Sequence, residues 1–335
     1  MAFYENLHLE KGMYGTGKSF SAVLESLDRS ENYRGTPLEE LDAYQRQLKR
    51  FDIHVNGRGS DRVEKFFQTG ESAALFPEYV CRAVRQGMEQ ENLLPSLVAT
   101  TTQVEGMDYR TITSTPLEAE KELKLVAEGS AVPQTVVRTQ DHLVHLHKRG
   151  RMLVASYEAL RFQRLDLFTV TLRQIGAYIA RMQMGDAVQV LLHGDDGKDQ
   201  AEELTAEKGV TYAGLLQLWG KLTPYRMNGL LGGTAAVQQV LGLAEMRDAQ
   251  AGLNFQGTGR LVAPMGAQLL HVPDVPDGKL IGIDRTCALE MVQAGDVQTE
   301  YDKLIDRQLE RATISTIAGF TKIFNGAVKV LNCAA

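Results

Sequence analysis

Residues 12–19 (GMYGTGKS) have the types and spacing of a phosphate-binding loop. In the pattern G-x-x-x-x-G-K-[ST], backbone N–H groups surround the phosphates of a nucleotide and the lysine contacts them. This chemistry requires a buried strand before the loop and a helix after it. A helix after residue 19 is expected, but residues 5–11 (ENLHLEK) are too polar for a central parallel strand. The residues that would bind phosphate are Gly12, Gly17, Lys18 and Ser19.

Residues 280–284 (LIGID) could serve as the acidic second motif of a nucleotide-binding domain. The regular alternation of strands and helices that builds such a domain is missing between the two segments. A nucleotide-binding enzyme is therefore the less favoured interpretation, and a glycine-rich segment without a ligand is the favoured one. Binding of a labelled ATP analogue that Lys18→Ala abolishes would reverse this order.

Three histidines, His142, His145 and His147, lie close together beside Asp141. On a strand, His145 and His147 share one face and His142 points to the other. Two ligands on one face are too few for a structural metal site, which usually has four. We therefore expect polar residues of a loop strand, with pH sensing at a subunit contact as the alternative.

No other segment has the pattern of a catalytic, cofactor or metal site. The signatures G-x-S-x-G and H-E-x-x-H are absent. Trp219 lies in a helical pattern and is expected in the core. The remaining acidic cluster is expected to be a solvated turn, because glycine and lysine separate its members, Asp195, Asp196 and Asp199.

Length and composition are those of a folded protein. The 335 residues are 44% hydrophobic and 23% charged, which excludes wholesale disorder. The net charge of −6 lacks the basic surplus usual in proteins that read nucleic acid. No signal-peptide core and no membrane-length apolar run is present, so we expect a soluble protein made in the cytoplasm. Disulfides and zinc are not expected from three distant cysteines, Cys81, Cys287 and Cys333.

The N-terminal fifth of the chain, residues 1–66, is polar and contains two short helical patterns. One pattern covers residues 19–27, and the other follows Thr36-Pro37, which fits an N-cap with proline at the first helical position. Two small helices bury too little surface to fold alone. We therefore interpret residues 1–66 as an arm that becomes ordered on neighbouring subunits.

The centre of the chain predicts a helix, a β-rich loop and a long helix. Residues 76–88 have apolar side chains at steps of four, and residues 103–147 favour strands. A long helix over 156–184, stopped by Gly185, would be about 40 Å long. Four arginines, Arg161, Arg164, Arg173 and Arg181, lie off its apolar stripe. The stripe consists of Leu165, Phe168, Leu172, Ile175, Ile179 and Met182.

After an apolar run at 190–193, the pattern changes to shorter elements. Residues 195–208 are predicted to be a solvated linker, and residues 211–243 to be helical with a turn at 232–234. Short strands are expected between 261 and 283, and further strands between 311 and 331.

This order of segments resembles the tailed-phage major capsid proteins of the Hong Kong 97 type. The segments that carry the resemblance are TGESAALFPEYV (69–80), EGSAVP (128–133), ASYEAL (155–160) and VLLHGD (190–195). It extends over about residues 67–332. The resemblance implies an α+β Hong Kong 97-like capsid fold with an N-terminal arm, an extended β-hairpin loop, a long spine helix, a peripheral domain and an inserted axial domain.

The resemblance also implies a division of the chain. The expected parts are the arm (1–66), the first part of the peripheral domain (67–102), the extended loop (103–147), the peripheral domain with the spine helix 156–184 (148–197), the axial domain (198–308) and the C-terminal strands of the peripheral domain (309–335).

The function implied is structural, not enzymatic. Such subunits assemble as hexamers and pentamers into an icosahedral shell around double-stranded DNA, in the virion of a tailed bacteriophage or in a prophage-derived particle. Their partners are copies of themselves, DNA held without sequence-specific contacts, and scaffolding, portal and decoration proteins; no membrane is involved. An encapsulin-like nanocompartment is the alternative. Some members cross-link a lysine to an asparagine, but no role is assigned to the candidates Lys121, Lys124, Asn325 and Asn332.

Overall fold

The computed structural model divides the chain into two compact units. Unit 1 comprises Met1–Asn92, Lys148–Arg181 and Gly295–Ile317, and unit 2 comprises Leu93–His147, Met182–Ala294 and Ala318–Ala335. Among the residues described, no helix is both long and apolar enough to span a membrane. The described residues are 4–15, 19–113, 125–126, 128, 138–140, 142–156, 162–197, 199–206, 209–247, 266–295, 297–304 and 309–334.

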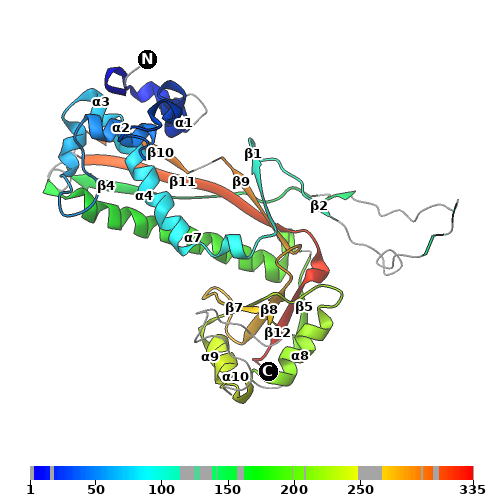
Figure 1. Cartoon of the computed structure of the whole chain (residues 1–335). Coiled ribbons are helices and arrows are strands. Elements are labelled where there is room, and N and C mark those ends of the chain that lie inside the picture. The colour runs from blue at the N-terminus through cyan, green and yellow to red at the C-terminus, as the bar shows by residue number, and fades with distance from the viewer. Residues whose placement is uncertain are drawn as a thin grey trace. The chain divides into compact units, whose positions relative to one another are not determined.

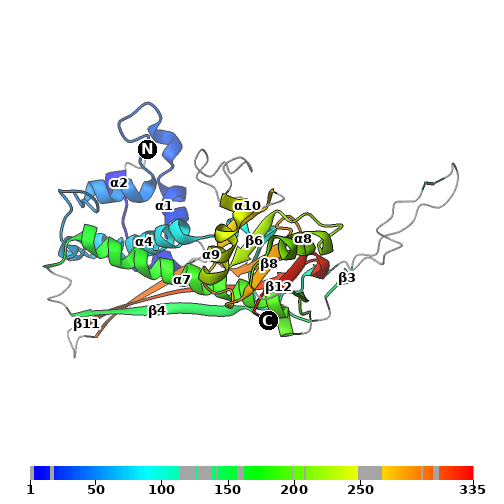
Figure 2. The same cartoon turned by 90° about the horizontal axis from the view of Figure 1, so that it is seen from below.

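Unit 1 combines short N-terminal helices with two longer helices and long strands (Figure 1). The strands β10 (Gln298–Leu304) and β11 (Leu309–Lys322) pair antiparallel, and β4 (His147–Ser156) also pairs with β11. Figure 2 shows β4 and β11 side by side. The helical segments are η1 Tyr4–Asn6, η2 Lys11–Gly15, α1 Phe20–Leu27, η3 Ser30–Tyr33, α2 Ala43–Arg50, η4 Val63–Phe67, α3 Gly70–Ala73, α4 Phe76–Glu91 and the first part of α7, Leu165–His193.

Helix α1 begins where the sequence predicts, and α2 does not. The Ser19 hydroxyl accepts a hydrogen bond from the backbone N–H of Ala22 and so caps α1. The second helix starts at Ala43, seven residues after the predicted cap at Thr36. A capping box explains this start: the Asp42 carboxylate accepts from the N–H of Gln45, whose side chain accepts from the N–H of Asp42.

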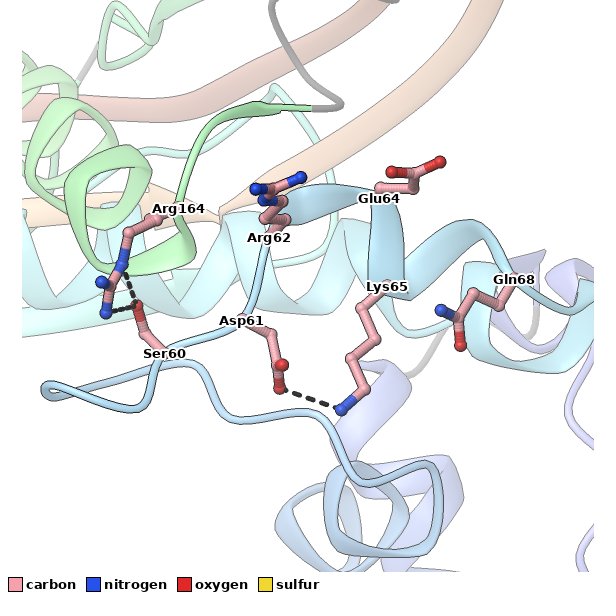
Figure 3. Close-up of a pocket in the computed structure, with 7 residues that line it drawn as sticks. All are labelled: Ser60, Asp61, Arg62, Glu64, Lys65, Gln68 and Arg164. Carbon is pink, nitrogen blue, oxygen red and sulfur yellow. Dashed lines mark hydrogen bonds and ion pairs between the residues drawn. The ribbon is translucent and has the colours of Figure 1, made fainter.

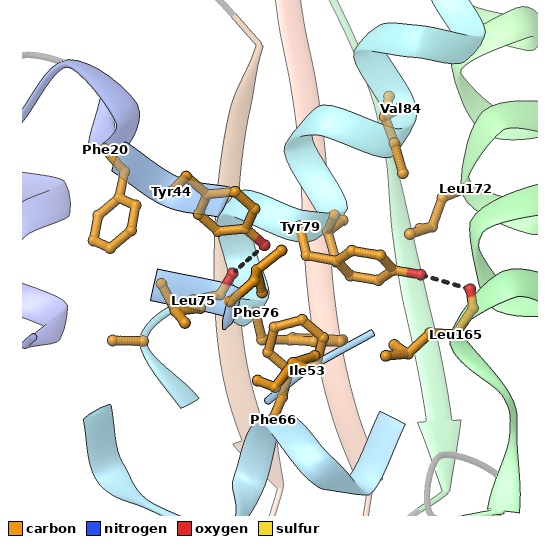
Figure 4. Packing of buried hydrophobic residues seen from close by; sticks show 14 of the residues in the cluster. Phe20, Tyr44, Ile53, Phe66, Leu75, Phe76, Tyr79, Val84, Leu165 and Leu172 are labelled. Carbon is orange, nitrogen blue, oxygen red and sulfur yellow. Dashed lines mark hydrogen bonds between the residues drawn. The ribbon is translucent and has the colours of Figure 1, made fainter. Parts of the chain in front are cut away.

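The N-terminal residues described belong to the core of unit 1, so their interpretation as an arm ordered only by neighbours is wrong. Their buried apolar side chains join those of α4 and α7 in one cluster (Figure 4). Two short helices bury little by themselves, but here they complete a core that α4 and α7 supply. From the N-terminal segment the cluster takes Leu9, Phe20, Leu24, Ala43, Tyr44, Leu48, Ile53, Val63 and Phe66.

Buried polar contacts fix these N-terminal residues further. The Arg46 side chain is fully buried, and its Nε lies 2.7 Å from Oδ2 of Asp28. Its other nitrogens donate to the backbone carbonyls of Asp28 and Leu41. Arg82 of α4 donates to Asp42 at 2.6 Å and to Glu78 at 2.9 Å, and so links α4 to the N-cap of α2.

Helices α4 and α7 contact each other backbone to backbone in unit 1 (Figure 1). A Cβ atom on Gly87 would lie 2.0 Å from the carbonyl oxygen of Arg173. One on Gly176 would lie 2.0 Å from the carbonyl oxygen of Val84. Only glycine fits at these two positions while the helices keep this separation.

The long helix has the expected length at a shifted position. α7 has 29 residues, about 43 Å at 1.5 Å per residue, but begins at Leu165; residue 156, the predicted start, is the last residue of β4. It also continues through Gly185, and the apolar run at 190–193 forms its last turn. Packing in unit 2 outweighs the helix penalty of glycine, which is about 1 kcal/mol. The buried residues that follow the glycine are Ala187, Val188, Leu191 and Leu192.

Unit 2 contains strands of two five-stranded sheets. In the first, β1 (Thr100–Val104) pairs parallel with β9 (Leu289–Ala294), which pairs antiparallel with the end of β11. The second has the order β5-β12-β8-β6-β7. Its strands are β5 Glu202–Thr205, β12 Val328–Asn332, β8 Lys279–Ile283, β6 Gly229–Gly232 and β7 Gln268–His271, and the helices of unit 2 include α8 Tyr212–Lys221, α9 Thr234–Gly242 and α10 Ala244–Arg247.

Three predictions for this region need correction. Residues 202–205 of the predicted linker form β5, which pairs parallel with β12. Residues 229–232 form β6 and interrupt the predicted helical stretch. The last strand, β12, pairs with β8 in the second sheet, so residues 328–332 belong with the predicted axial domain and not with the peripheral strands. These strands are short, and neighbours distant in sequence determine their pairing.

Candidate assembly surfaces

The outer face of α7 in unit 1 presents a stripe of apolar side chains. Leu167, Val170 and Tyr178 are 58%, 58% and 44% exposed. They project opposite to Leu165 and Leu172, which are fully buried. We call these three exposed residues the helix surface. When the opposite face of a helix is already buried in the core, an exposed apolar stripe is typical of a contact with another chain.

A second apolar surface lies on β4, which is an edge strand. Gly150 of β4 lies against Ile314 of β11, and Ile314 also pairs with Thr299 of β10. β4 therefore occupies the other edge of β11, and no described strand pairs with its outer side. Met152 and Val154, both more than half exposed, share one face of this strand. A long edge strand with apolar side chains invites association.

A hollow of about 470 Å³ lies before the start of α7 (Figure 3). Arg164 donates to Ser60 and to the carbonyl of Arg58, at 2.8 Å for the latter. Burial opposes ionisation of Asp61, but hydrogen bonds from His54 and Lys65 hold the pKa of its carboxyl below the usual value. Lys65 is paired with Asp61, and Arg164 donates to the backbone carbonyls of the 57–60 loop. We therefore interpret the hollow as a structural contact that holds this loop, and call it the Arg164 clamp.

Helix α8 carries an exposed apolar pair in unit 2. Leu216 and Trp219 are 41% and 48% exposed and lie three residues apart. The prediction that Trp219 lies in the core is therefore wrong. The buried positions of α8 are Gly214, Leu215 and Leu218. The prediction of a helix was therefore correct, but the prediction that its tryptophan faces the core was not.

The first residues of the predicted extended loop are fixed by a buried carboxylate of unit 2. Glu290 is 4% exposed and accepts hydrogen bonds from the hydroxyls of Thr102, Tyr109 and Thr111. The returning side is fixed by Gln140, which donates to the carbonyl of Lys322. Both ends of this segment are therefore held in place before any contact with another chain.

Beyond these anchors the described part of the loop is exposed. Strands β2 (Ile112–Thr113) and β3 (Arg138–Thr139) pair antiparallel. Leu125 is fully exposed, and Val126 is 43% exposed. Residues 114–124, 127 and 129–137, with Lys121, Lys124 and most of the EGSAVP segment, lie outside the described residues.

The structure does not supply the strand that the phosphate loop needs. Gly12 lies in η2, and Ser19 is the N-cap of α1, whereas Gly17 and Lys18 lie outside the described residues. Residues 7–10, directly before η2, form neither helix nor strand. Nucleotide binding therefore remains an untested alternative, and residues 7–10 do not form the preceding strand that it requires.

The proposed acidic partner of that loop organises a turn instead. Asp284 follows β8 in unit 2 and is 5% exposed. Burial opposes its ionisation, but donors from Thr286, Arg226 and Asn228 together lower the pKa of its carboxyl. Its oxygens are therefore engaged within unit 2, whereas the phosphate loop belongs to unit 1.

The structure gathers histidines around a cavity of about 260 Å³ in unit 2. His145 and His147 line it with His193, which sequence reasoning missed because it ends a helix far along the chain. His142 Nε2 lies 3.9 Å from Oδ2 of Asp195. Only His147 lies in a strand, so the predicted alternation of faces is wrong. No three ligating side chains among the described residues converge as a metal site.

The other polar candidates have structural contacts. Asn332 donates to Glu203 across the β5–β12 pair, and Asn325 begins the short helix η10 (Asn325–Ala327). The carbonyl of Asp199 accepts from Nζ of Lys322 at 2.7 Å. Lys322 is 3% exposed, and burial lowers its pKa to about 8 although Asp199 opposes this shift.

We expect Lys322 to make the protein more stable as the pH rises. An unfolded lysine has a pKa of about 10.4, so between pH 8 and 10 the unfolded chain binds more protons than the folded one. The free energy of unfolding should rise by about 2 kcal/mol between roughly pH 7 and 9.5 from this group. Urea unfolding of wild type and Lys322→Met across this range isolates the effect as a difference, and parallel pH profiles would contradict it.

Comparison with known proteins gives matches among solved structures only. No protein-family model and no curated protein sequence matches this chain. A virus-like particle from Pyrococcus furiosus is 12% identical, with a TM-score of 0.50 over 76% of this chain and 98% of that one. The capsid of a native GTA particle is 17% identical, with a TM-score of 0.51 over 75% and 91%.

A third similar structure is that of Mycobacterium phage Che8. It is 12% identical, with a TM-score of 0.50 over 69% of this chain and 86% of that chain. At such low identities the likeness concerns the fold. It extends over 69–76% of this chain and 86–98% of the chains compared.

Proposed function

We propose that this chain, which has the α+β Hong Kong 97-type capsid fold, is the subunit of a self-assembling protein shell. Capsid proteins of this fold are structural and not enzymes. The observation that carries the proposal is the extent of the fold match, which includes almost the whole length of shell subunits. The exposed apolar residues of α7, β4 and α8 agree with it, because a shell would cover them.

In its finer form, the proposal is the major capsid protein of a tailed bacteriophage or a prophage-derived particle. Hexamers and pentamers of the chain would enclose double-stranded DNA without sequence-specific contacts. The likeness to the phage structure and to the GTA capsid supports this form. The net charge of −6 agrees with a wall that does not bind packed DNA tightly.

An encapsulin-like nanocompartment is the second candidate, supported by the likeness to the virus-like particle from Pyrococcus furiosus. Negative-stain microscopy of the expressed chain tests the shared part of both proposals. Closed shells are expected, and a persistent monomer or dimer would contradict them. The contents of shells isolated from their natural source separate the two, since double-stranded DNA supports the capsid and an enzyme supports the nanocompartment.

The helix surface provides a sharper test of assembly. Val170→Glu places a charge in the centre of this surface, where a subunit contact would bury it without a partner. We expect association to weaken by roughly a hundredfold or more while the subunit stays folded. Light scattering measures assembly, and circular dichroism measures folding.

Ala22→Glu is the matched control for this variant. It adds the same charge at an exposed position in the first turn of α1, where a carboxylate favours the helix. Assembly of Ala22→Glu at the wild-type level is expected. Equal assembly of Val170→Glu would exclude the helix surface from the subunit contacts.

A further inference from the structure

Three asparagines in the chain are followed by glycine: Asn56, Asn228 and Asn325. In such a pair the backbone nitrogen of the glycine can attack the side-chain amide carbon of the asparagine. A C–N bond forms, the side-chain nitrogen leaves as ammonia, and a five-membered succinimide results. Water then opens the ring to aspartate or to isoaspartate. The step needs a mobile side chain and an unhindered approach, so the fold decides which pair reacts.

The surroundings of Asn56 permit this reaction. Asn56 and Gly57 are both exposed, in the loop that the Arg164 clamp holds. Among the residues described, none makes a hydrogen bond to the Asn56 carboxamide. Gly57 has a φ of +83°, and no atom lies within 4 Å of the position that a Cβ would take. The space beside the Cα of Gly57 is therefore open, and glycine adds no side chain of its own next to the nitrogen that the amide carbon must approach.

The other two pairs are restrained by the fold. The Asn228 amide donates to Asp284 at 2.9 Å, and its oxygen accepts from the N–H of Arg285 at 2.8 Å. Gly229 is buried in β6. Asn325 and Gly326 lie in η10, where the helical backbone turns the glycine nitrogen away from the side chain. A Cβ on Gly326 would lie 2.9 Å from the ring of Tyr225, so this approach is crowded as well.

We propose that Asn56 is a site of spontaneous deamidation, with water as the only co-reactant. The change adds a carboxylate to a loop whose carbonyls at Gly57 and Arg58 accept from Arg164. In the isoaspartyl product the backbone gains a methylene directly before those carbonyls. Formation of the isoaspartyl product therefore changes both the charge of the loop and the length of its backbone. This inference is independent of the proposed function.

Peptide mapping by mass spectrometry tests the proposal on the intact, folded chain incubated in warm, mildly alkaline buffer. Aspartyl and isoaspartyl products are expected at Asn56, at a rate roughly a hundredfold above that at Asn228, because misplaced reacting groups lose about this factor. Isoaspartyl methylation gives a second readout, and Asn56→Gln should abolish most of its signal. Incubation of the chain in urea provides the control, in which all three pairs should react at similar rates.

Two results would overturn the proposal. In the first, the native chain shows equal rates at Asn56 and Asn228, which would mean that the fold has no influence. In the second, Asn325 of the native chain deamidates faster than Asn56, which would mean that the exposed loop does not provide the geometry that favours the reaction. Asn56→Gln is a surface change in an open loop, so failure to fold does not confuse either result.

Discussion

Replacing Arg46 with methionine is expected to lower the free energy of unfolding of unit 1 by about 3–5 kcal/mol. The substitution leaves Asp28, 1% exposed, as a buried carboxylate without the guanidinium that lies 2.7 Å away. It also removes the donors to the carbonyls of Asp28 and Leu41, which join the end of α1 to the start of α2. Unpaired buried acceptors add to the loss.

Two further variants distinguish the lost ion pair from lost packing. Arg62→Met removes an exposed arginine of the same unit and should change stability by no more than about 0.5 kcal/mol. Arg46→Met combined with Asp28→Leu removes both charges and should recover part of the loss. Urea unfolding of subunits, with limited proteolysis of residues 4–66, measures these effects. A mild effect of Arg46→Met alone would mean that the N-terminal residues fold independently of this contact.

Gly176→Ala is expected to destabilise unit 1 by about 3 kcal/mol, although alanine favours helices. The added methyl group would lie 2.0 Å from the carbonyl oxygen of Val84, in the backbone of α4. The backbone of a helix cannot rotate aside as a long side chain can. The two helices must therefore separate along the contact, and the side chains packed beside it lose contacts.

The control for this prediction is Gly220→Ala in α8. Gly220 also lies inside a helix, but a Cβ there meets no atom within 4 Å. This change should stabilise the protein by up to about 1 kcal/mol. Thermal unfolding followed by circular dichroism compares the two variants. Stabilisation by both would contradict the backbone contact between α4 and α7.

Sequence periodicity predicted that α4 and α7 are helices and identified several of their buried residues. Residues 76–88 were predicted as a helix, and α4 extends to Glu91 because no proline or glycine stop follows at once. On α7, Ile175 and Ile179 are buried as predicted, whereas Met182 is 49% exposed. The stop predicted at Gly185 was wrong because contacts from distant strands compensate for a local penalty.

The assembly surfaces were less predictable because an exposed apolar residue looks like a core residue in sequence. Trp219 and Leu216 occupy a helix that is apolar on more than one side, so spacing alone did not decide which side faces water. Met152 and Val154 alternate as buried strand residues would. Only the pairing of β4 with β11 shows that they lie on an edge. Glu290 and its three hydroxyl partners are about 180 residues apart and form no pattern.

The interleaving of the two units has a consequence for synthesis on the ribosome. Unit 1 needs residues 295–317 and unit 2 needs residues 318–335, so neither can be completed until the ribosome has synthesised these late segments. The nascent polypeptide must carry the apolar side chains of α4 and α7 for most of that time without their final partners. Premature association of unfinished chains is then the main hazard, and molecular chaperones that shield nascent chains should raise the yield.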